Sequence, residues 1–149
     1  MNHMEQFKMD IFKKEIINKE FPWFRSLGQE ECRDIRDSIN KCILGEDVRS
    51  PLDLVHKVSE LQLALTNYNA EQDNFSLSGL MDNINIVPNE YIYINWYRYD
   101  NIDTMKFKDF DSCFEHIWYP GPDDIDIFDK SFKWILSINH EGDVSIYVQ

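Results

Sequence analysis

Trp118-Tyr-Pro-Gly-Pro-Asp-Asp-Ile-Asp-Ile-Phe-Asp129 is the stretch around which this chain is organised. Two large aromatic residues meet a Pro-Gly-Pro sequence, and the acids that follow are Asp123, Asp124, Asp126 and Asp129. The apolar residues between these acids indicate a strand or helical turn with one buried side. Aromatic side chains beside strong negative charge suit a surface that binds a basic partner. The alternative is a solvated acidic turn before a core strand.

The residues that follow form the clearest structural signal in the chain. In residues 132–138, apolar side chains recur at every second position, as in a strand. Residues 139–143 contain one glycine, and apolar side chains again occupy every second position at Val144, Ile146 and Val148. Two alternating runs joined by a short loop with glycine predict a β-hairpin.

Upstream, residues 91–98 also alternate. Ile92, Ile94 and Trp96 point one way, and tyrosines, among them Tyr93 and Tyr97, point the other. Tyrosine combines apolar contact with a hydroxyl and is favoured at interfaces. The tyrosine face is therefore either a contact surface or a second face covered by helices.

The spacing of apolar residues predicts helices over residues 4–20, 29–44, about 50–68 and 106–118, with one helical turn at 76–81. Gly45 ends the second helix, and Ser50-Pro51 begins the third as N-cap and first helical residue. The aromatic residues of 21–24 are interpreted as a core plug between the first two helices, with a partner-binding patch as the alternative. Cys32 and Cys42 fall on the apolar stripe of the second helix and are interpreted as small buried residues.

Together these elements predict one α+β domain over residues 1–149. Helices occupy about residues 1–69, and a small, mostly antiparallel sheet with the order strand-helix-strand-strand occupies about residues 76–149. The length, with 43% apolar residues, is sufficient to bury a core without disulfides or metal.

The charge of this chain is negative and unevenly distributed. The net charge is −12, of which residues 1–69 carry −2 and residues 100–149 carry −7. Such a field repels phosphate backbones and anionic lipid and attracts basic proteins, so we expect no direct binding to nucleic acid or membranes. Acidity for solubility alone is the alternative.

The three cysteines are widely spaced, the first residues lack an apolar signal-like region, and no apolar run has the length of a membrane span. These features predict reduced thiols in a cytoplasmic protein.

The sequence offers no catalytic signature. It has no phosphate-binding glycine loop, no Gly-x-Ser-x-Gly and no His-Glu-x-x-His. The acids from Asp124 to Asp129 lack the turn glycine and the terminal glutamate of a calcium loop. We therefore expect no enzyme activity, cofactor or metal site, although an enzyme of unrecognised type stays open, as does a ligand-binding or oligomeric accessory domain.

The run from Ile125 to Tyr147, together with the small size and the acidity, resembles immunity proteins of bacterial toxin systems, such as those of contact-dependent growth inhibition. This resemblance implies a cytoplasmic inhibitor, or antitoxin, that binds one cognate toxin domain, often a basic nuclease. It assigns no residue roles. From the residues themselves, the candidate contact set is Trp118, Tyr119, Asp123, Asp124, Asp126, Asp129, Tyr93 and Tyr97.

Overall fold

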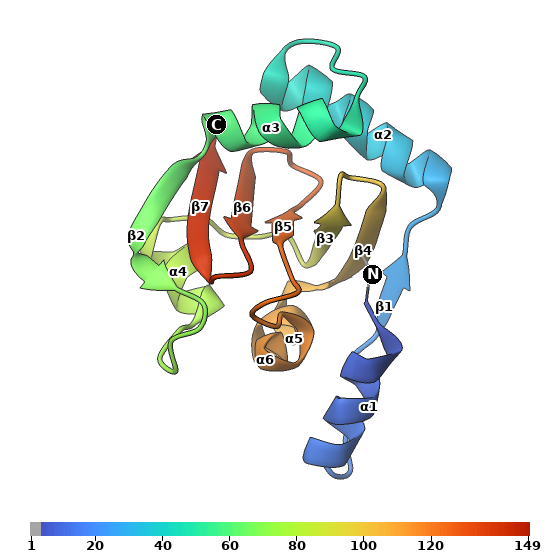
Figure 1. The fold of residues 1–149 in the computed structure, drawn as a ribbon, viewed down its shortest axis with the longest axis vertical. Coiled ribbons are helices and arrows are strands. Elements are labelled where there is room, and N and C mark those ends of the chain that lie inside the picture. The colour runs from blue at the N-terminus through green and yellow to red at the C-terminus, as the bar shows by residue number, and fades with distance from the viewer. Residues whose placement is uncertain (1–3) are drawn as a thin grey trace.

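The computed structural model describes residues 4–149 as an α+β fold in which helices cover both faces of one antiparallel sheet (Figure 1). In chain order the elements are α1 (Gln6–Glu15), β1 (Phe24–Ser26), α2 (Gln29–Ile39) with a π-helical turn (Asn40–Leu44), α3 (Pro51–Leu61), β2 (Leu63–Asn69), α4 (Leu77–Asn83), β3 (Tyr91–Tyr97), β4 (Asn101–Lys106), α5 (Phe107–Ser112), α6 (Phe114–Ile117), β5 (Ile125–Phe128), β6 (Trp134–Ile138) and β7 (Asp143–Val148).

The seven strands lie in the order β1-β4-β3-β5-β6-β7-β2, and every neighbouring pair is antiparallel. The predicted fold class is thus confirmed, as are the β6–β7 hairpin and the apolar face of β3. The sheet is larger than expected because four strands, β1, β2, β4 and β5, join the three predicted ones. Two of them, β1 and β2, come from the part of the chain that the sequence assigned to helices.

Each face of the sheet has its own core. Ile92, Ile94 and Trp96 of β3 pack with α4, α5 and α6 on one face. On the other face, Phe128 and Ile135 pack with α2 and α3. Helices therefore cover the tyrosine side of β3 in part, which was one of the two interpretations of that face.

The third helix ends seven residues earlier than predicted. It stops at Leu61, and residues 63–69 pair with β7 as an edge strand. The Gln62 side chain explains the change of direction, because its Nε2 donates to Ser137 Oγ at 2.7 Å and to the Ile135 carbonyl at 3.2 Å. These bonds attach the chain to the sheet where the helix ends.

Two further helix predictions and the predicted core plug need correction. The first helix ends at Glu15 and not at residue 20, with Asn18 in the left-handed region. The helix predicted over 106–118 is two short helices separated at Cys113, preceded by β4. In the predicted core plug, Phe21 and Phe24 are half-buried against the first core, but Trp23 is 57% exposed.

The second helix follows its prediction as far as Ile39, and then its register changes. The π-helical turn Asn40–Leu44 widens the helix before Gly45 ends it with φ +68°. A π turn contains an extra residue, which rotates the following side chains around the axis. Cys42 is therefore exposed and not buried as predicted, whereas Cys32 is buried.

This difference predicts unequal thiol reactivity. Iodoacetamide should modify Cys42 first, because its side chain is exposed, while Cys32 is enclosed and its burial raises the pKa of its thiol. Mass spectrometry of the folded protein over time should give modification at Cys42 well before Cys32. Equal rates in the folded state would contradict the register change at the π turn.

Candidate functional site

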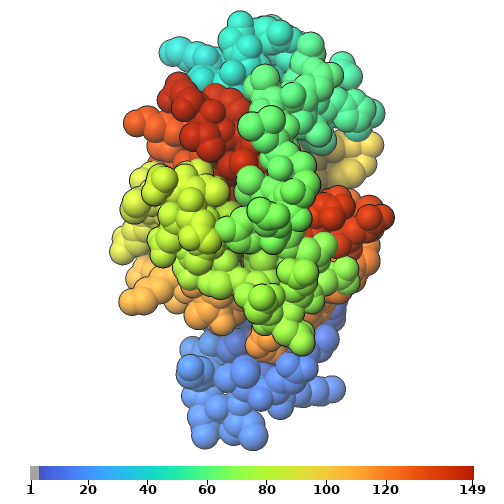
Figure 2. Space-filling view, turned by 90° about the vertical axis from the view of Figure 1, so that its left-hand side faces the viewer, coloured from blue at the N-terminus to red at the C-terminus, as the bar shows by residue number. Residues whose placement is uncertain are grey.

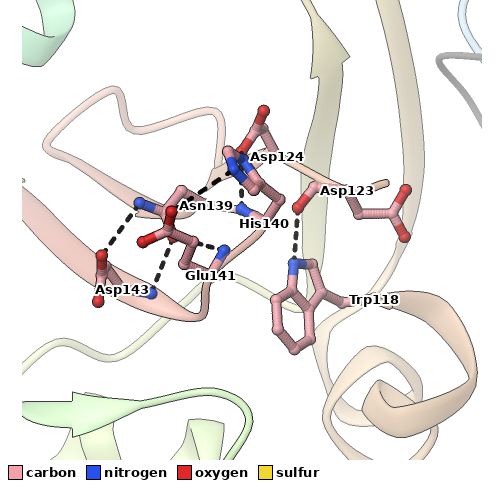
Figure 3. Close-up of polar contacts among 7 residues, drawn as sticks. All are labelled: Trp118, Asp123, Asp124, Asn139, His140, Glu141 and Asp143. Carbon is pink, nitrogen blue, oxygen red and sulfur yellow. Dashed lines mark hydrogen bonds and ion pairs between the residues drawn. The ribbon is translucent and has the colours of Figure 1, made fainter. Parts of the chain in front are cut away.

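The stretch from Trp118 to Asp129 forms a corner between α6 and β5. Trp118 caps α6, and Gly121 turns the chain with φ +98° while its N–H donates to the His140 carbonyl at 2.9 Å. The Trp118 indole donates to the backbone carbonyl of Asp123 at 3.0 Å, which holds the corner closed (Figure 3). The β6–β7 loop thus lies against the corner.

Two of the four predicted contact carboxylates point into the protein. Asp123 is 3% exposed, and its Oδ2 accepts from Lys8 Nζ at 2.7 Å and from the Tyr119 N–H at 2.9 Å. Asp129 is 1% exposed and accepts from the Trp134 indole at 3.1 Å and the Asn89 N–H at 3.0 Å. Neither side chain presents its charge at the surface, so the expectation that these two face a partner is corrected.

Lys8 is a buried residue that the sequence did not single out. Its side chain is fully enclosed, and besides Asp123 its Nζ donates to the Ile117 carbonyl at 2.7 Å and lies 4.2 Å from the centre of the Trp96 ring. The lysine therefore connects α1 to the end of α6 and to the corner. The sequence contained one indication that Lys8 is buried, because it lies four residues after Met4 and four before Phe12, on the apolar side of α1. Lysine is rarely buried at such a position, so burial was not predicted.

Asp126 faces the opposite side of the sheet. It is half-buried, and it accepts from the side chains of Asn95 at 2.8 Å and of Ser137. Burial raises the pKa of Asp126 above its ordinary value, although hydrogen bonding from Ser137, Asn95 and Tyr99 lowers it in part.

Asp124 alone of the four aspartates is exposed. Its Oδ1 accepts from the backbone N–H of His140 at 2.7 Å and lies 2.9 Å from His140 Nδ1 (Figure 3). In the same loop, Asn139 Oδ1 accepts from the backbone N–H groups of Glu141 and Asp143 at 2.9 Å each. The loop is thus ordered by its own polar side chains and holds two further acids at the surface.

Asp124 raises the pKa of His140 through the hydrogen bond and its charge. Replacing Asp124 with asparagine should lower the pKa of His140 toward its ordinary value of about 6.5, which an NMR pH titration of the ring protons measures. Because the folded-state pKa is the raised one, the interaction contributes at low pH and disappears as pH rises through that value. An unchanged titration in the variant would contradict the pairing.

Beside the corner lies a groove of about 320 Å³ with aromatic walls and acidic edges. Phe114 and Trp118 stack with ring centres 5.8 Å apart, and the ring centres of Phe75 and Phe114 are 5.4 Å apart. Tyr119 lies at the other end, where burial raises its pKa. The acidic residues that line the groove are Glu71, Asp73 and Glu115.

The groove and the loop make up one acidic face. The β2–α4 connection reaches the β6–β7 loop through two bonds, from Asn69 Nδ2 to the Glu141 carbonyl and from the Ala70 N–H to the Gly142 carbonyl. Figure 2 shows this side of the molecule, with β2 and the connection in green and the residues of α5 and α6 in orange beneath. The exposed members of the acidic face are Glu71, Asp73, Glu115, Asp124, Glu141 and Asp143. Within residues 4–149 no lysine or arginine lines the groove, and the sequence has none between Lys57 and Arg98.

The two predicted tyrosines lie away from this face. Tyr93 lines a different cavity of about 380 Å³ with Trp23, Arg25 and Lys130. Tyr97 is 40% exposed and lies under the Arg98 guanidinium at 4.5 Å, beside a cleft that Asp124 and Asp126 also line. The eight predicted contact residues therefore do not form one surface. Whether they bind a partner stays a prediction.

Comparison with known protein families, with curated proteins and with solved structures finds no match for this chain. Among residues 4–149, no helix is long and apolar enough to cross a membrane, and no group of three or more His, Cys, Asp or Glu side chains is arranged to hold a metal ion.

Proposed function

We propose that this protein is an inhibitor that binds one basic partner protein through the acidic face. The observation that carries this proposal is the convergence of six exposed carboxylates from four separate segments on one face. Three of them line an aromatic groove that no lysine or arginine of residues 4–149 lines. The resemblance to immunity proteins supplies the partner class. In this proposal the partner is a toxin domain of the basic nuclease type, and both proteins act in the cytoplasm.

The chemistry of the face suits such a partner. A nuclease must be basic where it holds phosphate, so a surface of carboxylates can occupy the same groove as the nucleic acid. Charge complementarity also accelerates association, which an inhibitor needs if it is to act before damage occurs. Half-buried aromatic residues such as Phe114 and Tyr119 would supply the apolar anchors that make a complex long-lived.

The role assigned to the corner changes accordingly. Trp118 and Asp123 support the face from within, whereas Asp129 lies at the other end of β5 and contacts Asn89 and Trp134. Asp124 and Tyr119 are the members of the original contact set that remain at the face. We assign no catalytic role to any of these residues.

A direct test uses the gene organisation that the proposal requires. A large toxin gene should lie immediately upstream, and its C-terminal domain, expressed alone in a bacterial host, should arrest growth. Co-expression of this protein should restore growth, and native mass spectrometry should give a 1:1 complex. Persistent growth arrest despite soluble co-expression, or no complex between the purified proteins, would refute the proposal.

A further inference from the structure

On the opposite face of the sheet from α4, α5 and α6, a cleft of about 330 Å³ separates α3 from the ends of β3, β5 and β6. Leu52, Val55 and Val58 of α3 line it with apolar groups. Its polar side is a row of neighbouring strand residues, in which Asn95 pairs with Asp126 and Asp126 with Ser137. The cleft therefore combines an apolar wall with a polar one, as small-molecule sites do.

Asp126 is a half-buried carboxylate that has no ion-pair partner within residues 4–149. Its donors, the Asn95 amide and the Ser137 hydroxyl, and the nearby Tyr99 hydroxyl are all neutral, and no lysine, arginine or histidine of these residues forms an ion pair with it. A desolvated carboxylate is costly unless a cation compensates its charge. Asp123 is a buried carboxylate whose charge is compensated, because Lys8 Nζ forms an ion pair with it at 2.7 Å.

The other buried carboxylates without cations are closed off. Asp103 and Asp129 are 0% and 1% exposed, and tryptophan indoles are among the donors to both. Asp126 differs from them because it lines a cleft that a ligand can enter.

The turn after β3 adds an unpartnered polar atom to the same place. Tyr99 is completely buried and lines the cleft, and burial together with the nearby Asp126 carboxylate raises the pKa of its hydroxyl well above the ordinary value. Beside it, Arg98 Nε is buried without a hydrogen-bond partner among residues 4–149. Unsatisfied buried groups of this kind are rare in folded proteins and require an explanation.

The backbone of this turn is also strained. Arg98 and Tyr99 both adopt left-handed backbone angles, with φ of 53° and 58°, which is unfavourable for residues other than glycine. Asn95 Oδ1 holds the turn by accepting from the backbone N–H groups of Tyr97 and Tyr99. Such strain often accompanies functional sites.

We propose that this cleft binds a small organic cation, an alkylammonium or alkylguanidinium group, whose charged nitrogen pairs with Asp126. The N–H groups of the ligand donate to the lone pairs of that carboxylate that Asn95 and Ser137 leave free. The alkyl chain packs on Leu52 and Val55. The same group is found in a free amine and in a lysine or arginine side chain of a protein, and neither source requires the function proposed above.

Titration of the ¹⁵N-labelled protein with n-butylammonium tests this inference. The side-chain amide signals of Asn95 and Gln62 should shift in a saturable manner. n-Butanol, which has the same chain without the charge, should bind at least about tenfold more weakly, a difference of about 1.4 kcal/mol. Equal affinity for the two compounds, or no shift with either, would overturn the proposal.

A second set of ligands distinguishes a free amine from a lysine or arginine side chain of a partner protein. N-acetyl-lysine amide and N-acetyl-arginine amide represent a protein side chain with its backbone attached. Tighter binding of these capped residues than of n-butylammonium assigns the cleft to a partner's side chain, and binding of the free amine alone assigns it to a small molecule. Both results support the cationic ligand class.

Variants test the role of Asp126. Asp126→Asn should weaken n-butylammonium binding by about tenfold or more. The control Glu60→Gln, an exposed residue of α3 that does not line the cleft, should change it by about threefold or less. Because Asp126→Asn disturbs a buried network, Ser59→Trp provides an independent check, since Ser59 is exposed on α3 and lines the cleft. Its bulk should block the mouth and abolish binding. Undiminished binding in a folded Ser59→Trp variant would refute the site.

Discussion

Replacement of Lys8 with alanine is expected to lower the free energy of unfolding by about 3–5 kcal/mol, the usual cost of removing one partner of a buried ion pair. The lysine is fully enclosed, and its Nζ satisfies both the Asp123 carboxylate and the Ile117 carbonyl at 2.7 Å. Alanine leaves the carboxylate with only the Tyr119 N–H as its donor and removes the contact with Trp96. Urea unfolding followed by tryptophan fluorescence measures the change.

The matched control is Lys13→Ala, on the same helix but exposed, which should change the unfolding free energy by no more than about 0.5 kcal/mol. The double variant Lys8→Met, Asp123→Asn should lose less than the sum of the losses in the single variants Lys8→Met and Asp123→Asn, because it removes both charges together. Additive losses in this cycle, or a Lys8→Ala variant as stable as the control, would show that the pair does not hold α1 in place.

Elements with a regular apolar period could be predicted from the sequence, and those with polar core positions could not. The β6–β7 hairpin and the apolar face of β3 follow their alternation because Ile94, Leu136 and Ile146 all enter one core. In β4, the buried positions include Asp103, which accepts from Met4, Ser26 and Trp96. A carboxylate in the core obscures the two-residue period, so the strand was not recognised.

The same effect limited the prediction of the site. Acids near aromatic residues suggested an exposed contact surface, but the indoles of Trp96 and Trp134 donate to buried carboxylates, and the Trp118 indole donates to the backbone of Asp123. These indoles lie only five to seven residues from the aspartates that they bond, but the same spacing is compatible with a pair at the surface, so the sequence does not show that these pairs are buried. The acidic face itself combines residues 71–73, 115, 124 and 141–143, which only the folded chain brings together.

Reversal of charge on the acidic face should reduce the association rate with the basic partner by about 10- to 1,000-fold at low salt, the range over which electrostatic steering acts. A variant with Glu71, Asp73, Glu115 and Glu141 each changed to lysine alters the charge by eight units. All four side chains are exposed, and none forms an ion pair with a lysine or arginine within residues 4–149. The fold should therefore be retained, and stopped-flow measurement against the toxin domain gives the rate.

A matched control separates the position of the charge from its amount. Glu30, Asp34, Asp53 and Glu60 are exposed acids of α2 and α3, away from the acidic face, and their change to lysine gives the same net charge. If the face is the docking surface, the first variant should associate far more slowly than the control, and the difference should shrink as salt screens the field. Equal rates for the two variants would mean that net charge alone steers the encounter, and the docking surface would then lie elsewhere on the molecule.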